Sequence, residues 1–124
     1  PGSSEVFECG IVSYSNDIKM KLLDVSPETL DTYGAVSEQT AREMALGAKR
    51  VSGADIAIST TGLAGPGGDG VLPGGLSFVA VTDGDRVFVE KIVTGHENDR
   101  EYNRHVTATR ALNLARIMLE EKIK

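Results

Sequence analysis

The sequence lacks tryptophan, has a single cysteine and contains no long run of hydrophobic residues. One cysteine, Cys9, cannot form an internal disulfide, and this usage is typical of a reducing compartment, so we expect a cytoplasmic protein. No apolar stretch approaches the roughly 18 residues that a membrane helix needs, and we expect no signal peptide. Basic residues are also scarce, because 13 lysines and arginines stand against 18 acids for a net charge of −5. We therefore expect a soluble protein that binds neither membranes nor nucleic acids.

The chain has enough hydrophobic residues for one folded domain. Its 124 residues, 40% of them hydrophobic, can bury a core without disulfides or metals. We find no internal repeat and no linker, so residues 1–124 are expected to be one domain. The 14 glycines point to functional loops.

Helix-start signals occur three times before the middle of the chain. Each is a serine followed by helix-favouring residues: Ser15 with Asn16, Ser26 with Pro27, and Ser37. Glycines end the second and third helices. The predicted helices span residues 17–23, 27–33 and 38–51.

Strand signals occur four times, and a long helix follows them. Runs rich in β-branched and apolar residues predict strands at 5–14, 54–59, 76–82 and 86–94, with a hairpin at 83–85. Cys9 is expected to be a small core residue of the first strand. The order of elements predicts an α/β fold: a three-layer domain with a mixed β-sheet flanked by helices.

The last helix is expected to begin at Asn98 and to run almost to the C-terminus. Hydrophobic spacing predicts which residues share one face. That face contains Val106, Thr109, Leu112, Arg116, Leu119 and Ile123, with Ala108, Ala111 and Ala115 alongside.

A glycine-rich loop over residues 60–70 is the strongest local motif. Gly65, Gly67 and Gly70 match the G-x-G-x-x-G pattern of dinucleotide-binding proteins. That pattern requires a helix after the loop, whereas a strand is expected here, so we disfavour a dinucleotide site. The loop still suits an anion, because glycine leaves backbone N–H groups accessible. A mobile surface loop is the alternative.

Two further groups of residues carry possible chemistry. Lys19 falls in the first turn of a short helix, close after Tyr14, where the helix dipole would lower the lysine pKa as a general base requires. A solvated surface lysine is the alternative. Arg100 and Arg104 lie one turn apart at the start of the last helix and could hold a phosphate or carboxylate. Ion pairs with neighbouring acids are the alternative there.

Metal and cofactor signals are weak. His96 and His105 lie nine residues apart without a third ligand at metal spacing, so we expect neither a metal nor a cofactor. No Ser-His-Asp set is evident either. The residues alone predict an α/β domain with an anion-binding glycine loop.

Several segments, in order and along nearly the whole chain, resemble the C-terminal domain of the competence-damage-inducible CinA family. They are residues 1–4, 14–19, 34–38, 61–68 and 99–100. The resemblance implies an amidohydrolase that converts nicotinamide mononucleotide and water into nicotinic acid mononucleotide and ammonia, in pyridine-nucleotide salvage.

The resemblance also implies roles for individual residues. Lys19 matches the lysine of the family's serine–lysine pair, and Tyr14 matches the tyrosine beside it. Thr61 and Gly62 would line the carboxamide pocket, and Arg100 matches an arginine near the substrate. The full set of candidate substrate-binding residues is Asn16, Thr61, Gly62, Gly65, Arg100 and Arg104.

The sequence departs from the family in two places. The family's upstream helix, strand and A-E-S-C-T-G-G segment, whose serine is the nucleophile, are not part of it. Residues 71–75 also stand where the family has a longer stretch, so we expect the reach of the glycine-rich loop to differ from that in the family. We expect an uncovered sheet edge, closed by homo-oligomerisation, with a dimer favoured, or by an upstream domain or fragment. One reading is an amidase whose serine comes from elsewhere. The other is a truncated, non-catalytic module that binds a nucleotide or only assembles.

Overall fold

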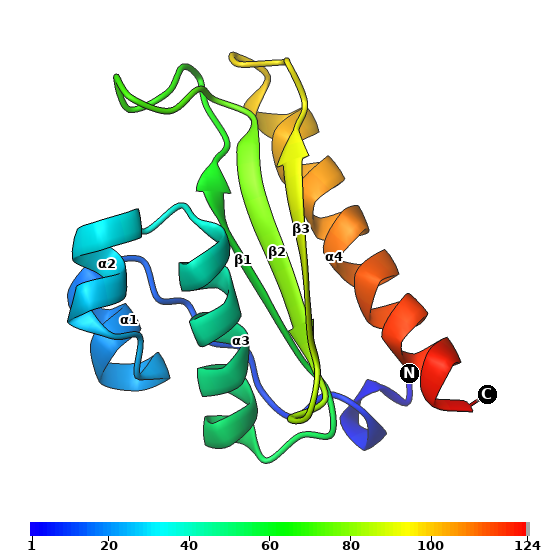
Figure 1. The fold of residues 1–124 in the computed structure, drawn as a ribbon. Helices are drawn as coiled ribbons and strands as arrows, with labels where there is room; N and C mark the ends of the chain where they lie inside the picture. Colours follow the sequence, from blue (N-terminus) through cyan, green and yellow to red (C-terminus); the bar gives the residue numbers. More distant parts are fainter. Residues whose placement is uncertain (124) are drawn as a thin grey trace.

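Three antiparallel strands form the sheet at the centre of the structure (Figure 1). The structure is a computed structural model that describes residues 1–123. The strands are β1 (Ala57–Leu63), β2 (Leu76–Thr82) and β3 (Val87–Val93), in the order β1-β2-β3. Both pairings are antiparallel, so the expected mixed sheet is wrong for the described residues.

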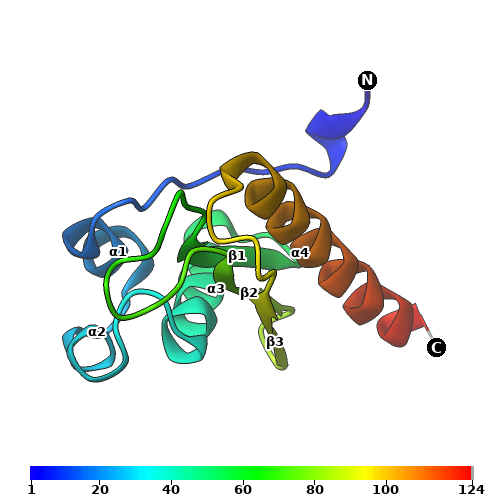
Figure 2. The ribbon, with the colours of Figure 1, turned by 90° about the horizontal axis from the view of Figure 1, so that it is seen from above.

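Helices cover both faces of this sheet, and the predicted three-layer α/β fold is confirmed (Figure 2). Helix α3 packs on one face and α4 on the other, while α1 and α2 pack outside α3. The helices are α1 (Asn16–Leu23), α2 (Pro27–Tyr33), α3 (Glu38–Ser52) and α4 (Arg100–Ile123), after a 3₁₀ turn at Ser3–Glu5.

The core follows from the alternation of side chains along β2. Ala80 faces α3, where it packs with Ala41 and Ala45. Val79 and Val81 face α4 and pack with apolar residues of that helix. Their partners on α4 are Ala111, Ala115 and Met118.

The predicted helix starts are confirmed in detail. The hydroxyl oxygens of Ser15, Ser26 and Ser37 each accept a hydrogen bond from the backbone N–H three residues later. Ser15 is therefore the cap of α1, and Asn16 is its first helical residue. Gly34 and Gly53 end α2 and α3, as predicted.

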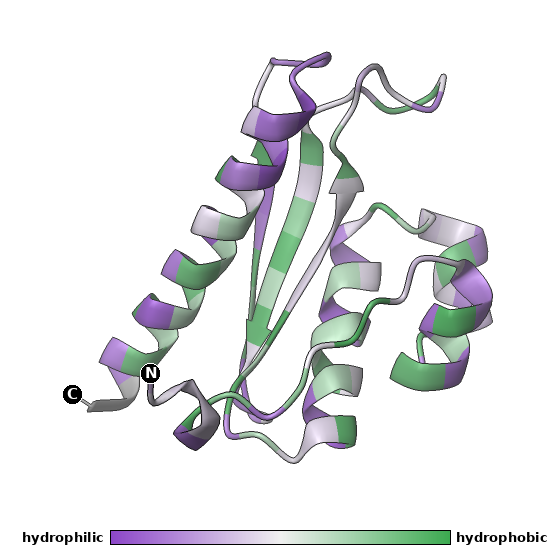
Figure 3. Ribbon diagram, turned by 180° about the vertical axis from the view of Figure 1, so that it is seen from behind, coloured by the Kyte–Doolittle hydropathy of each residue, from purple (hydrophilic) through white to green (hydrophobic). Residues whose placement is uncertain are grey.

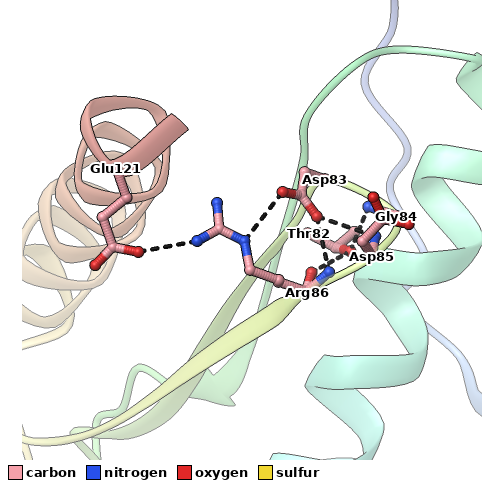
Figure 4. A network of polar contacts seen from close by, with 6 residues as sticks. All are labelled: Thr82, Asp83, Gly84, Asp85, Arg86 and Glu121. Atoms are coloured by element: carbon pink, nitrogen blue, oxygen red, sulfur yellow. Dashed lines mark hydrogen bonds and ion pairs between the residues drawn. The ribbon is translucent and has the colours of Figure 1, made fainter. Parts of the chain in front are cut away.

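The hairpin between β2 and β3 is held by Asp83 (Figure 4). One carboxylate oxygen accepts hydrogen bonds from the N–H groups of Asp85 and Arg86, and the other accepts from the Arg86 side chain. Arg86 also pairs with Glu121 at 2.9 Å. The hairpin is thereby fastened to the C-terminal end of α4.

The predicted first strand is wrong. Residues 7–14 are extended but pair with no strand, and they run from the C-terminal end of α4 to α1, in front of the sheet in the view of Figure 3. An extended sequence becomes a strand only beside a hydrogen-bonding neighbour, and none adjoins this segment in the described chain. Cys9 is therefore exposed, and its expected place in the core is also wrong.

Strand β1 begins and ends later than predicted. It continues through Thr60, Thr61 and Gly62, which we had assigned to the glycine loop. Gly62 pairs with Ser77, and a Cβ on Gly62 would overlap Ser77 and the Leu76 carbonyl. Glycine is thus a packing requirement of the strand here.

The predicted start of α4 is wrong, and its predicted buried face is wrong in part. The helix begins at Arg100, because Asp99 caps it by accepting a hydrogen bond from the N–H of Tyr102. Leu112 and Leu119 of the predicted face are 65% and 45% exposed, and the side chain of Ile123 lies outside the described residues. The buried stripe runs along Asn103, Ala111, Ala115 and Met118, so two of the three alanines expected alongside the face are buried. Small alanines let the helix approach the sheet, so the larger leucines are turned outward.

Helix α4 is the longest helix of the chain, yet neither it nor any other helix in residues 1–123 is long and apolar enough to cross a membrane.

We predict that Gly47→Ala destabilises the protein although alanine favours helices. Gly47 of α3 lies against α1, where an added Cβ would overlap the Leu23 carbonyl group. Overpacking of this kind costs about 1–3 kcal/mol, which exceeds the gain in helix propensity of about 1 kcal/mol. Chemical denaturation measures the change, with the exposed Leu46→Ala as a control in the same helix. An unchanged or higher unfolding free energy for Gly47→Ala would contradict the close packing.

Candidate functional site

A groove of about 1190 Å³ lies between the N-terminal segment (residues 6–14) and β1. We call it the β1 groove. Helix α4 contributes the side chains of Arg104, Thr107 and Ala108 to its wall, and α1 contributes Lys19. Five of the eight candidate residues line this groove: Tyr14, Lys19, Thr61, Gly62 and Arg104. Asn16, Gly65 and Arg100 do not line it.

Both long walls of the β1 groove offer free backbone groups. Strand β1 pairs only with β2, so its other edge is unpaired in the described chain. Across the groove, the backbone of residues 8–14 makes no hydrogen bond to another described backbone group. Val6, Phe7 and Val12 are exposed beside it. The expected uncovered edge and apolar surface are thus present in the structure.

Lys19 is buried at the side of the groove, with 6% of its surface exposed. Its Nζ donates hydrogen bonds to the carbonyl oxygens of Ser13 (2.7 Å) and Tyr14 (3.4 Å). It has no carboxylate partner in residues 1–123. Burial lowers the pKa of Lys19 below its ordinary value of 10.5. The alternative of a solvated surface lysine is therefore wrong, and Lys19 suits a base.

The two other N-terminal candidates are less constrained. Tyr14 is 94% exposed, and it contacts Lys19 through its backbone carbonyl. Asn16 is exposed and does not cap α1, since Ser15 does. A chemical role for either side chain stays a prediction.

Thr61 and Gly62 reach the groove from β1, but the Thr61 hydroxyl is already committed. It donates to the carbonyl of Ala35 at 2.6 Å. Thr60, which we did not single out for this role, has an exposed side chain and lines the groove. Thr61 therefore contributes backbone rather than its hydroxyl.

The glycine loop, now residues 64–75, is held by its own hydrogen bonds and by the start of α4. Asp69 accepts from the N–H groups of Val71 and Leu72, and these bonds lower the pKa of its carboxyl. Gly67 donates to the carbonyl of Glu97 and to the side chain of Asn98. These ties disfavour a freely mobile loop. Strand β2 follows the loop, so no helix is available for a pyrophosphate, as expected.

The two arginines play different structural parts. Arg100 donates to the carbonyl of Gly65 at 2.8 Å and thus fastens the loop to α4. Arg104 lines the groove and has no hydrogen bond or ion pair within the described residues. The alternative of local ion pairs is not observed for either one. Arg104 is the guanidinium that an anion in the groove would meet.

One buried residue escaped the sequence analysis. Asn103 lines the groove, is 2% exposed and bonds to residues after β1 and β3. Hydrophobic spacing does not predict that a polar residue such as Asn103 is buried. Only its surroundings in the folded structure show that it is. No group of three or more His, Cys, Asp or Glu side chains in residues 1–123 could hold a metal.

Comparisons with known proteins agree with this architecture. The family model described as the CinA C-terminal domain matches residues 1–119. A CinA-like protein of Chloroherpeton thalassium is 46% identical over 124 residues, covering 96% of this chain and 29% of that protein.

Solved structures show the same likeness. The competence/damage inducible protein CihA from Agrobacterium tumefaciens is 41% identical with a TM-score of 0.86, over 92% of this chain and 70% of that one. A competence or damage-inducible protein from Enterobacter asburiae is 32% identical with a TM-score of 0.80, over 95% and 72% of the two chains. The chain spans less than a third of the length of the curated relatives it matches.

We predict that Lys19→Met raises stability at neutral pH and that this advantage shrinks as pH rises. With its pKa lowered in the folded state, Lys19 binds a proton more weakly there than in the unfolded chain. The burial penalty is complete below the folded-state pKa, decreases between that pKa and 10.5, and is absent above 10.5. Urea denaturation of both proteins across this range measures the difference. The exposed Lys21→Met is the matched control, and a pH-independent Lys19→Met difference would contradict the lowered pKa.

Proposed function

The chain belongs to the CinA C-terminal domain family, and from this premise we propose that it is the base-bearing part of an amidohydrolase acting on nicotinamide mononucleotide. Nicotinamide mononucleotide and water would give nicotinic acid mononucleotide and ammonia. The observation that carries the proposal is Lys19, a buried lysine of lowered pKa with no carboxylate partner in the described chain. It lies beside a groove large enough for a ligand.

The neutral amine of Lys19 would act as general base. It takes the proton from a hydroxyl group as that oxygen bonds to the carboxamide carbon. The tetrahedral oxyanion accepts hydrogen bonds from backbone N–H groups near Thr61 and Gly62. The C–N bond then breaks, and nitrogen leaves as ammonia with the proton that Lys19 returns. Water, activated in the same way, hydrolyses the ester and regenerates the hydroxyl.

The nucleophile would come from outside residues 1–124. No described hydroxyl hydrogen-bonds to Nζ of Lys19, because both of its partners are backbone carbonyls. The serine-bearing segment that the resemblance implies is the proposed source. The free edge of β1 and the facing N-terminal segment support a place for it in the β1 groove.

The phosphate of the nucleotide is assigned to Arg104. Arg104 lines the groove, and its guanidinium has no partner among the described residues, whereas Arg100 is bonded to the loop. A phosphate monoester suits a guanidinium that can offer two parallel N–H groups. Arg100 and Gly65 would then support this end of the groove rather than line it.

The absence of a hydroxyl at Lys19 in the described chain also favours a second function, a non-catalytic module that binds a pyridine nucleotide or only assembles. The exposed Val6, Phe7 and Leu119 support assembly as a homo-oligomer. The two functions predict different results for a form extended upstream. The amidohydrolase would release ammonia in that form, whereas the non-catalytic module would not.

We predict that this chain alone releases no ammonia from nicotinamide mononucleotide, and that a form extended upstream by the serine-bearing segment does. A coupled ammonia assay on both proteins tests this. Activity of the 124-residue chain would contradict the external nucleophile. An inactive extended form that still binds nicotinic acid mononucleotide, measured by calorimetry, would favour the non-catalytic module.

We further predict that Lys19→Ala in the extended form lowers kcat by about 10²–10⁴-fold, the usual contribution of a general base. The fold should persist, because alanine suits a helix and leaves no charge buried. Lys21→Ala, on the exposed side of α1, is the matched control and should keep wild-type kcat. Retained activity in a folded Lys19→Ala protein would remove Lys19 from the mechanism.

A further inference from the structure

Asn103 joins three segments at the end of the β1 groove. Its Nδ2 donates to the carbonyl oxygens of Ala64 (2.8 Å) and His96 (2.7 Å). Its Oδ1 accepts from the hydroxyl of Thr94 at 2.5 Å. Ala64 follows β1, Thr94 follows β3 and Asn103 lies in the first turns of α4. A single buried carboxamide therefore ties the two strand ends to the helix.

The neighbours of Asn103 require a carboxamide in one orientation. The Thr94 hydroxyl oxygen already accepts from the N–H of His96, so its own proton is free to donate to Oδ1. The two remaining neighbours are carbonyl oxygens, which need donors. An ionised aspartate has no hydrogen-bond donor for these carbonyl oxygens, and its negatively charged oxygens would face both of them. A leucine would leave the Ala64 carbonyl and the Thr94 hydroxyl proton without partners, and the His96 carbonyl with only the N–H of Asp99.

This arrangement bears on Arg104, which an anion in the groove would meet, and on the loop that adjoins it. Because the Ala64 carbonyl points to Asn103, the N–H of Gly65 across the same planar trans peptide points the other way. That N–H has no hydrogen-bond partner among the described residues. Arg104, the next residue along α4, lines the groove and has no hydrogen bond or ion pair within the described residues. Asn103 thus fixes the start of the glycine loop, which adjoins the groove, and the turn of α4 that carries Arg104.

We infer that Asn103 is a positioning residue for the phosphate end of the β1 groove. It holds α4 and the start of the glycine loop in one arrangement, so a nucleotide phosphate meets Arg104 already in place. The inference rests on the proposed function and adds a specific residue to it. Loss of this tie weakens substrate binding and spares the chemistry at Lys19, which lies on α1.

The test uses the extended form with nicotinamide mononucleotide as substrate. Asn103→Asp is expected to raise KM about tenfold, equivalent to about 1.4 kcal/mol, with kcat nearly unchanged. Thr94→Val, which removes the partner of Oδ1, is expected to raise KM similarly. The double variant should be little worse than either single one, because the two side chains act as a unit.

Thr40→Val is the matched structural control. Thr40 is fully buried and donates to the Gly34 carbonyl at 2.7 Å, but it does not line the groove. It should lower thermal stability as the Asn103 variant does and leave KM unchanged. A rise in KM of equal size in Thr40→Val would show that the effect of Asn103 on KM comes from general stability, and it would overturn the inference.

The remaining outcomes separate this inference from the proposed function. An unchanged KM in a folded Asn103→Asp protein, or a collapse of kcat alone, overturns the positioning role while the amidase stands. If the extended wild type does not turn over the substrate, the amidase proposal fails. Calorimetric binding of nicotinic acid mononucleotide then decides: weaker binding by Asn103→Asp than by Thr40→Val supports the inference, and equal or undetectable binding overturns it.

Discussion

Strand β2 is the element on which the rest of the structure depends. It is paired along both edges, and its side chains pack against α3 on one face and α4 on the other. Ala80 meets the alanines of α3, while Val79 and Val81 meet α4. Because both faces are used, neither helix can rotate without opening the core. Each outer strand pairs along one edge only, and the other edge of β1 is unpaired in the described chain.

That unpaired edge explains why the candidate site lies where it does. Free backbone groups along β1 and along residues 8–14 bound a groove, and α4 contributes further residues to its wall. Ordinary domains blunt or cover such an edge, since it invites pairing with another chain. Here it remains open beside exposed Val6, Phe7 and Val12. An edge of this kind can pair with another segment or with a second chain.

The sequence predicted the features that depend on neighbours along the chain. The serine caps at 15, 26 and 37 and the hairpin at 83–85 are local, and all are present. Features set by distant neighbours were missed. Residues 6–14 have the composition of a strand but lack a partner, and α4 is rotated from its hydrophobic stripe by the close approach of its alanines. For the site, spacing singled out Lys19 and Arg104, and the structure places both residues at the β1 groove, while their chemical roles stay predictions. No pattern could reveal Asn103, whose partners lie up to 39 residues away.

The environment of Lys19 links the open groove to the proposed chemistry. Its pKa is lowered by burial alone, and the carbonyls of Ser13 and Tyr14 that accept its hydrogen bonds favour the protonated amine. Because these two effects oppose each other, the pKa of Lys19 is lowered only in part while the groove is open to water. A segment occupying the groove would exclude that water and lower the pKa further, toward the range in which a lysine is neutral and can accept a proton. The segment that delivers the hydroxyl would thus also lower the pKa of Lys19. Binding of that one segment would supply the nucleophile and prepare the base together.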